Sequence, residues 1–567
     1  MKFADMPYER PDVAALKKQM QELVGRFEQA TDYGTAKEVF LEWDKLGRHV
    51  HTLETLASIR YSINTKDEFY SSEHDFWNMA GPELAEYDDK WTKALLETAF
   101  RKELAADFGE ILFTNAEIEK KAFSPAIIAD MQKENEIVNE YVKLTAAAEI
   151  PFEGKTYNTS QIEVYKTDAD DARRLAAWKA EGQWYKDNQS KIDDIYDRLV
   201  KVRTEMGRKL GYDNYLGLGY CRMMRNCYTK NDIEVFREAV VKYLVPICES
   251  IYKEQAKRLG KEYPMNFADN ALMFRSGNPR PKGTPDDIVA AGKKFYEALS
   301  PETAEFFNLM IDNELLDLLS KEGKRGGGYM TELPDYEVPF IFANFNGSQH
   351  DVEVVTHEAG HAFAGYLNRK RIPSSEMLPT MEACEVHSMS MEFFADPYAT
   401  DFFGDDARKY KYAHLAGSVT FIPYGALVDH FQHICYENPD LTPAGRHAQW
   451  KRLQQIYMPW VRLDGEIPFY SDGESWQYKH HIFDHPLYYI DYCLAQTVAL
   501  SFWAMIQEDA GEAWKHYMTY SKLGGSLTFT ELLKEAGLET PFGDAMLRKV
   551  CAKAEEYLDA YDLGGIS

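Results

Sequence analysis

The sequence has few cysteines and no long hydrophobic run. Only seven of its 567 residues are cysteine, and no two of them are spaced as Cys-x-x-Cys. An odd number of scattered cysteines argues against a disulfide framework and indicates reduced thiols, so we expect a cytoplasmic protein. The longest uncharged apolar stretch, Tyr492 to Ile506, has 15 residues and includes polar side chains, so it is too short to cross a membrane.

Basic residues are outnumbered by acidic ones, 64 to 91. The formal net charge is −27 at pH 7, which argues against nucleic acid or an anionic membrane as a partner. The N-terminal residues, MKFADMPYERPD, lack the apolar segment of a signal peptide. No Lys-Ser/Thr pair follows the glycine run at residues 326–328, so it is not a phosphate-binding loop. On the residues alone, we expect a surface turn.

Most of the chain carries apolar residues at helical spacing. The first example comprises Val13, Leu16, Met20, Leu23, Val24 and Phe27. The same spacing covers most of residues 35–147 and resumes over residues 168–210. Between them, residues 150–165 alternate in polarity and predict a small hairpin. Because a chain of this length exceeds the usual size of one core, we predict a mostly α protein with at least two lobes.

One stretch has the pattern of a metal site. His357 and His361 enclose Glu-Ala-Gly in the motif H-E-x-x-H, within an expected buried helix over residues 351–367. Residues four apart lie on the same helical face, so both imidazoles can reach one metal ion. Glu358 lies beside them and suits a general base acting on metal-bound water. Gly360 predicts that another backbone packs closely against this helix. Two core histidines without a metal are the alternative.

A catalytic zinc site requires a third protein ligand. The sequence predicts a second helix over residues 380–394, on which Glu385, Ser388 and Glu392 share one face. Charged side chains are unusual among the Met and Phe residues of such a helix. Glu385 is therefore the preferred third ligand, and Glu392 is expected to orient a ligand histidine. The competing candidates are Glu382 and His387, and a solvated acidic face is the alternative explanation.

A β-strand is predicted directly before the metal helix. Its residues, 338–345, read VPFIFANF. Pro339 cannot donate a hydrogen bond to a neighbouring strand, so we expect an edge strand. Such a strand could pair with the backbone of an extended peptide beside the metal, which would give weak side-chain selectivity.

Several of these motifs occur together in one known family. Glu385, within E-x-x-S-x-x-x-E, follows the second histidine of HEAGH by 24 residues. Further matches are Phe345, Asn346, Gly347 and Asp351, the stretch KEGKRGGGY at residues 321–329, and the segment from His481 to Tyr492. Together, the motifs resemble those of the thimet oligopeptidase family of zinc metallopeptidases, and especially its oligoendopeptidase F branch.

The resemblance implies a zincin-like fold of the HExxH gluzincin type. In this fold, two helical lobes flank a deep substrate groove, and a small β element lies beside the metal. The resemblance also implies one Zn²⁺ per chain, held by His357, His361 and Glu385. Short peptides are the implied substrates, and the resemblance implies that the glycine run at residues 326–328 closes over them, with a surface turn as the alternative.

The late segment is expected to assist catalysis. In the resembled family, a histidine and tyrosines of this region stabilise the oxyanion that forms when a peptide carbonyl is attacked. The residues of this sequence to which the resemblance assigns that role are His481, Tyr489 and Tyr492. Because the spacing here differs from the longer glycine-rich version of other branches, His480 could replace His481, and Tyr488 could replace Tyr489.

We therefore predict a helical N-terminal lobe over residues 1–200, with the hairpin near 150–165, and a catalytic zinc metallopeptidase region over residues 201–567. The expected activity is cleavage of internal bonds in short oligopeptides. A zinc metallocarboxypeptidase or peptidyl-dipeptidase on a similar helical fold is the alternative, although the sequence assigns no Arg or Lys to a terminal carboxylate. A non-catalytic metal-binding protein is a more distant alternative. The oligomeric state is not predicted.

Overall fold

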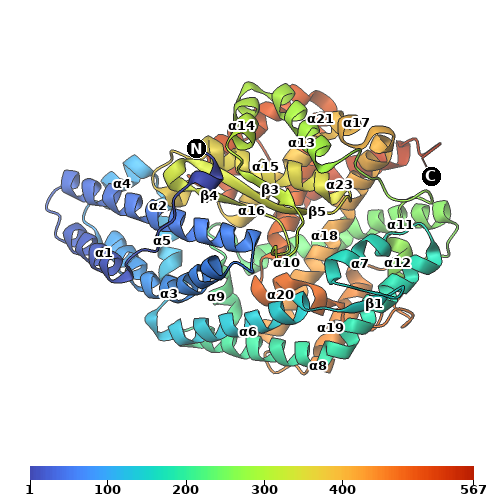
Figure 1. Ribbon diagram of the computed structural model, residues 1–567, viewed down its shortest axis with the longest axis horizontal. Helices are drawn as coiled ribbons and strands as arrows, with labels where there is room; N and C mark the ends of the chain where they lie inside the picture. Colours follow the sequence, from blue (N-terminus) through green and yellow to red (C-terminus); the bar gives the residue numbers. More distant parts are fainter. Residues whose placement is uncertain (567) are drawn as a thin grey trace.

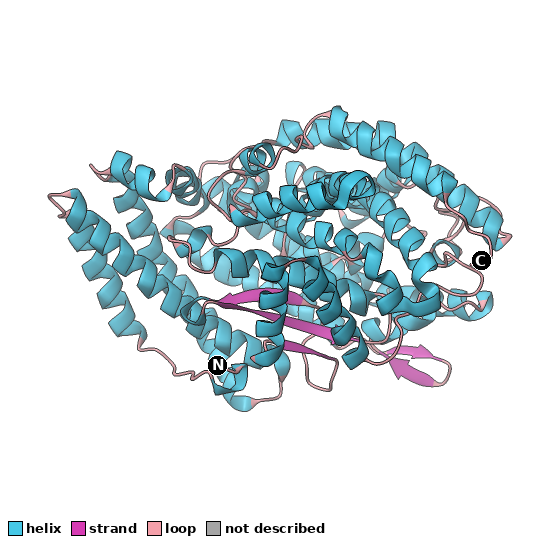
Figure 2. Ribbon diagram, turned by 90° about the horizontal axis from the view of Figure 1, so that it is seen from above, coloured by secondary structure: helices cyan, strands magenta, loops and turns pink. Residues whose placement is uncertain are grey.

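The computed structural model describes residues 1–566, and most of them are helical (Figure 1). A three-stranded sheet lies among the helices, and a separate hairpin lies at the periphery (Figure 2). The prediction of a mostly α protein with a small β element is therefore confirmed. The longest helices are α2 (Tyr33–Ile63), α3 (Glu68–Glu97), α8 (Asp171–Lys209), α18 (Ala407–Glu437) and α21 (Tyr489–Lys522).

The first helices form a group at the left of Figure 1. In α1 (Val13–Glu28), five of the six predicted apolar positions are buried, and only Val13 is partly exposed. The side chain of Asp12 caps this helix by accepting a hydrogen bond from the Ala14 N–H at 2.9 Å. The group continues through α4 (Arg101–Phe108) and α5 (Ile111–Ala122), whereas α6 (Ile128–Ala146) packs along α8.

The predicted hairpin is shorter than expected. Strands β1 (Ile150–Phe152) and β2 (Lys155–Tyr157) pair antiparallel, but residues 159–166 belong to helix α7 (Thr159–Lys166). The helix begins there because Asn158 and Gln161 form a reciprocal capping box. The alternating pattern after Tyr157 therefore did not indicate a strand.

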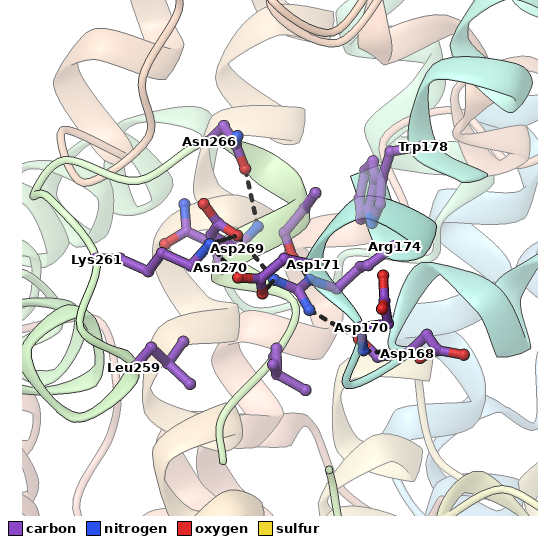
Figure 3. A network of polar contacts seen from close by, with 12 residues as sticks. Asp168, Asp170, Asp171, Arg174, Trp178, Leu259, Lys261, Asn266, Asp269 and Asn270 are labelled. Atoms are coloured by element: carbon purple, nitrogen blue, oxygen red, sulfur yellow. Dashed lines mark hydrogen bonds and ion pairs between the residues drawn. The ribbon is translucent and has the colours of Figure 1, made fainter. Parts of the chain in front are cut away.

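Helix α8 runs through the predicted boundary at residue 200, so no break in the chain marks it. The helix is also tied to α12 (Phe267–Asn270) by a polar network around Arg174 (Figure 3). This fully buried guanidinium donates hydrogen bonds to the Ala268 carbonyl at 2.8 Å and to Asp269 at 2.8 Å. Lys261 adds ion pairs to Asp269 and to Asp171 of α8. The division into residues 1–200 and 201–567 remains a prediction.

The strand predicted over residues 338–345 is present, but it is not an edge strand. In the order β3–β5–β4, strand β5 (Val338–Phe345) lies between β3 (Leu316–Leu319), which is parallel to it, and β4 (Tyr329–Leu333), which is antiparallel. Pro339 is tolerated because it lies opposite β4 only, and pairing with β3 begins at Ile341. The edge-strand prediction for β5 is therefore wrong, and β4 is an edge strand instead.

Helix α15 (His350–Asn368) follows β5 and carries the H-E-x-x-H motif. Asp351 fixes the intervening turn, since its carboxylate accepts hydrogen bonds from the Asn346 N–H at 2.9 Å and the Gly347 N–H at 2.7 Å. Helix α16 (Met381–Phe394) packs between α15 and α21. A Cβ on Gly360 would lie 2.8 Å from the Ser388 Cα, which confirms the predicted close approach of a second backbone.

The remaining α-helices complete the shell around these elements. Their bounds are α9 (Tyr215–Arg222), α10 (Lys230–Ala239), α11 (Val245–Leu259), α13 (Pro285–Leu299), α14 (Pro301–Asp312), α17 (Ala399–Phe403), α19 (Pro443–Tyr457), α20 (His480–Asp484), α22 (Phe529–Glu535) and α23 (Asp544–Ala560). Among residues 1–566, no helix has both the length and the apolar character of a membrane span. All seven cysteines are free thiols.

Candidate active site

Helices α15 and α16 bring the three predicted metal ligands together. The Nε2 atoms of His357 and His361 each lie 3.3 Å from Oε2 of Glu385. One ligand atom from each residue lies within 4.8 Å of the others, as a shared ion requires. The His357 and His361 side chains are 22 % and 12 % exposed, so a small molecule can reach them.

The donor set fits a divalent cation such as zinc. Two imidazoles and one carboxylate are common ligands of a catalytic zinc, which keeps a further position open. The surroundings of the ligands carry negative charge. Burial lowers the pKa of His357, but hydrogen bonds to Glu385 and Glu392 outweigh burial and raise that pKa well above its usual value. A cation between the ligands would balance this charge.

Glu392 lies between His357 and a second histidine. One of its carboxylate oxygens lies 2.7 Å from Nδ1 of His357, and the other lies 2.8 Å from Nε2 of His414 on α18. Burial would raise the pKa of Glu392, but the hydrogen bonds to the two histidines lower it to about 2. An anionic Glu392 leaves Nε2 of His357 directed at the ligand cluster. The sequence indicated Glu392 but not His414, because nothing in the motif spacing points to α18.

The face predicted on α16 also contains Ser388. Its hydroxyl donates a hydrogen bond to Oε2 of Glu385 at 3.0 Å. The two competing third ligands lie elsewhere. Glu382 is fully buried and accepts a hydrogen bond from Thr380 at 2.7 Å, while burial and the charge of Asp491 raise its pKa to about 8. His387 is fully buried beside α21, and burial lowers its pKa to about 3.

Replacing Glu392 by Gln is expected to weaken zinc binding by about 10- to 100-fold, because loss of the carboxylate removes the group that orients His357. Competition against a chromophoric chelator measures the affinity. Glu382→Gln is a matched control from the same helix, since Glu382 is already largely protonated at neutral pH. Equal affinities for both variants would contradict the orienting role.

The late aromatic segment reaches the site through Tyr488. Its hydroxyl donates a hydrogen bond to Oε1 of Glu385 at 2.5 Å. The Tyr492 ring packs at a tilt against Tyr488, with ring centroids 4.7 Å apart. Burial and the charges of Glu385 and Glu358 raise the pKa of Tyr492 well above its usual value. Tyr489, to which the resemblance assigned the oxyanion role, is buried and has no hydrogen bond to the ligand cluster among residues 1–566.

His481 lies within this aromatic group, whereas His480 contacts the group only by stacking on His481, with ring centroids 4.0 Å apart. The ring centroids of His481 and Tyr492 are 5.8 Å apart, whereas the His480 side chain is 57 % exposed and bonds Asp484 at 3.0 Å. Burial, together with the neighbouring His480 and Lys479, lowers the pKa of His481 far below its usual value, so its imidazole is neutral.

The glycine run lies beside Glu358. A Cβ on Gly328 would be 3.9 Å from Oε1 of Glu358 and 3.4 Å from the Phe342 carbonyl oxygen. Asn344 of β5 holds the run by donating hydrogen bonds to the carbonyls of Arg325 at 2.8 Å and Gly327 at 2.9 Å. The run is therefore anchored next to the expected general base, at the start of β4.

Comparisons with known proteins agree with these features. Residues 3–123 match the Peptidase M3 N-terminal domain, and residues 299–551 match Peptidase family M3. Oligopeptidase PepF of Bacillus subtilis (strain 168) is 23% identical over 335 residues, which cover 55% of this chain and 49% of that protein. The chain thus matches about half the length of this curated relative.

Two solved structures are similar over nearly the full chain. PZ peptidase A, solved with an inhibitor, is 42% identical, with a TM-score of 0.95 over 99% of this chain and 100% of that chain. A protein from Bacillus anthracis str. Ames, provisionally named oligoendopeptidase F, is 39% identical, with a TM-score of 0.91 over 99% of both chains. The similarity therefore includes both the helical fold and the region of the ligand cluster.

Proposed function

Since the chain belongs to peptidase family M3, and is therefore a peptidase, we propose that it is a zinc-dependent metalloendopeptidase that cuts internal bonds of short oligopeptides. The observation that carries this proposal is the convergence of His357, His361 and Glu385, with Glu358 next to His357 on helix α15. A zinc ion held by the three ligands would supply Lewis acidity to a substrate carbonyl and to a neighbouring water.

Glu358 moves the proton in this proposal. It accepts a proton from the attacking water and passes it to the leaving amine, so one carboxylate serves as base and then as acid. Its place on α15, next to His357 and beside Gly328, supports this role. The glycine run leaves room for a peptide backbone near Glu358.

Donors from the late segment stabilise the negative charge that develops on the carbonyl oxygen. We assign this role to Tyr488, Tyr492 and His481. Tyr488 takes the place first given to Tyr489, because its hydroxyl is the one that contacts Glu385. His481 acts as a neutral donor, consistent with its lowered pKa.

Substrate backbone pairing is proposed at β4. As an edge strand that starts next to Glu358, β4 can extend its ladder with a peptide, and main-chain hydrogen bonds then give broad side-chain tolerance. We also propose a cytoplasmic location, which the free cysteines support.

A peptide blocked at both ends distinguishes this activity from the exopeptidase alternative. We expect internal cleavage of an acetylated and amidated peptide of about eight residues, with two fragments identified by mass spectrometry. Trimming of an unblocked peptide without cleavage of the blocked one would instead establish a metallocarboxypeptidase or a peptidyl-dipeptidase.

A further inference from the structure

Lys479 is an enclosed cation that the described chain leaves without an acidic partner. Its Nζ lies over three tyrosine rings, 5.5 Å from the centroid of Tyr424, 5.2 Å from Tyr478 and 5.1 Å from Tyr489. These rings come from α18, from the turn before α20 and from α21. Among residues 1–566, no ion pair or side-chain hydrogen bond of Lys479 is present.

Other enclosed lysines of the chain do have acidic partners. Lys166 pairs with Glu163 and Glu181 at 2.6 Å, and Lys324 pairs with Asp317 at 2.5 Å. Glu163 also acts on Lys479 at longer range, but it is already bonded to Lys166. Enclosed lysines are rarely unpaired, because loss of hydration destabilises their charge.

The tyrosine rings provide part of the compensation. A cation over aromatic faces is stabilised by their negative electrostatic potential, but a full anionic partner is still missing. Burial lowers the pKa of Lys479 to about 8, so the ammonium remains mostly protonated at neutral pH. The residue is partly exposed, so the side chain is not sealed off from solvent.

The position of this cation connects it to the candidate active site. The Tyr489 ring, which lies under the ammonium, has its centroid 5.1 Å from that of His481. His481 in turn neighbours Tyr488, with ring centroids 6.0 Å apart, and Tyr488 bonds Glu385. A continuous row of rings thus separates Lys479 from the ligand cluster.

We propose that Lys479 binds a carboxylate of the peptide substrate, either its C-terminal carboxylate or an Asp or Glu side chain, a few residues from the cleaved bond. The inference rests on the proposed peptidase function. A carboxylate completes the ion pair that the protein leaves open, and charge-assisted hydrogen bonds to an ammonium are strong. Since Lys479 lies at a fixed distance from the ligands, the contact also selects which bond reaches the zinc.

The test compares matched quenched peptides of about eight residues. One pair differs only in a free or amidated C-terminus, and a second set moves a single Glu, replaced by Gln in its partner, along the sequence. For the best-placed carboxylate, we expect kcat/KM to exceed that of the neutral partner by about tenfold or more, mainly through KM. Lys479→Met should bring this ratio near one, and Lys479→Arg should restore part of it.

Lys242→Met is the matched control. This exposed lysine also lies over a tyrosine ring, 4.7 Å from the centroid of Tyr243, but far from the ligand cluster in the chain. It should keep the wild-type ratio. If Lys479→Met does not fold, the wild-type enzyme alone tests the inference. A ratio of the two kcat/KM values near one for every position of the carboxylate then overturns it.

The outcomes separate the inference from the proposed function. An unchanged preference in folded Lys479→Met overturns the inference while cleavage of blocked peptides still supports the endopeptidase. Cleavage only of free-acid peptides, lost in Lys479→Met, supports the carboxylate site but replaces the endopeptidase with an exopeptidase. No cleavage of any peptide refutes the proposed function, and the inference with it.

Discussion

Glu358→Gln is expected to lower kcat for peptide cleavage by about 10²- to 10⁴-fold, the usual contribution of a general base. Gln has nearly the same shape as Glu but cannot accept a proton from water. Because Glu358 is not one of the three converging ligands, zinc content should stay near one ion per chain. The rate of peptide cleavage at saturating substrate gives kcat, and elemental analysis gives the zinc content.

Glu353→Gln provides the control for this variant. Glu353 is on the same helix, one turn before His357, and one of its oxygens accepts a hydrogen bond from Gln349 at 2.5 Å. Its loss should reduce kcat far less than loss of Glu358. Wild-type kcat in zinc-loaded Glu358→Gln would contradict the general-base role, and loss of zinc would show that Glu358 has a role in binding.

Tyr488→Phe is expected to lower kcat by about 10²- to 10³-fold, as removal of an oxyanion donor does in other hydrolases. The variant removes only the hydroxyl that contacts Glu385. Tyr489→Phe is the matched comparison on the neighbouring residue, and it should have a much smaller effect because the ring that packs against His481 is kept. The two kcat values and the zinc contents are measured together.

Two results would contradict the oxyanion role of Tyr488. A large decrease in kcat for Tyr489→Phe with a small decrease for Tyr488→Phe would assign the oxyanion donor to Tyr489 instead of Tyr488. Loss of zinc from Tyr488→Phe, without an effect on kcat of the zinc-loaded fraction, would mean that Tyr488 positions the ligand Glu385 and does not stabilise the transition state.

Local periodicity predicted the helices, and it indicated three residues that the structure brings together in the candidate site. The four-residue spacing of His357 and His361 corresponds to one helical turn, and the charged face of α16 indicated Glu385 and Glu392. These signals are contained within single helices. The close approach at Gly360 was also visible, because a glycine inside a buried helix usually has a packing reason.

Two of the errors came from contacts between distant segments. Strand β3 lies parallel to β5, and no local pattern indicates that a remote strand covers one side of it. Pro339 therefore suggested an edge that is present only at the start of β5. His414 was missed for the same reason, since it reaches Glu392 from a separate helix.

The choice between Tyr488 and Tyr489 also depends on nonlocal contacts. Leu487 has a φ of +69°, an uncommon value for a residue with a side chain. Its carbonyl accepts a hydrogen bond from Arg225, and its N–H donates to Gln432 at 2.9 Å. This turn directs Tyr488 toward Glu385, whereas the sequence alone shows only two adjacent tyrosines.

The central claim is that His357, His361 and Glu385 hold a zinc ion that is required for internal cleavage of peptides. The most direct test follows cleavage of a peptide of about eight residues, blocked at both ends, before and after removal of metal by a chelator. We expect internal cleavage by the untreated protein, loss of activity after chelation, and recovery when zinc is added at about one ion per chain. Undiminished cleavage by metal-free protein would contradict the claim.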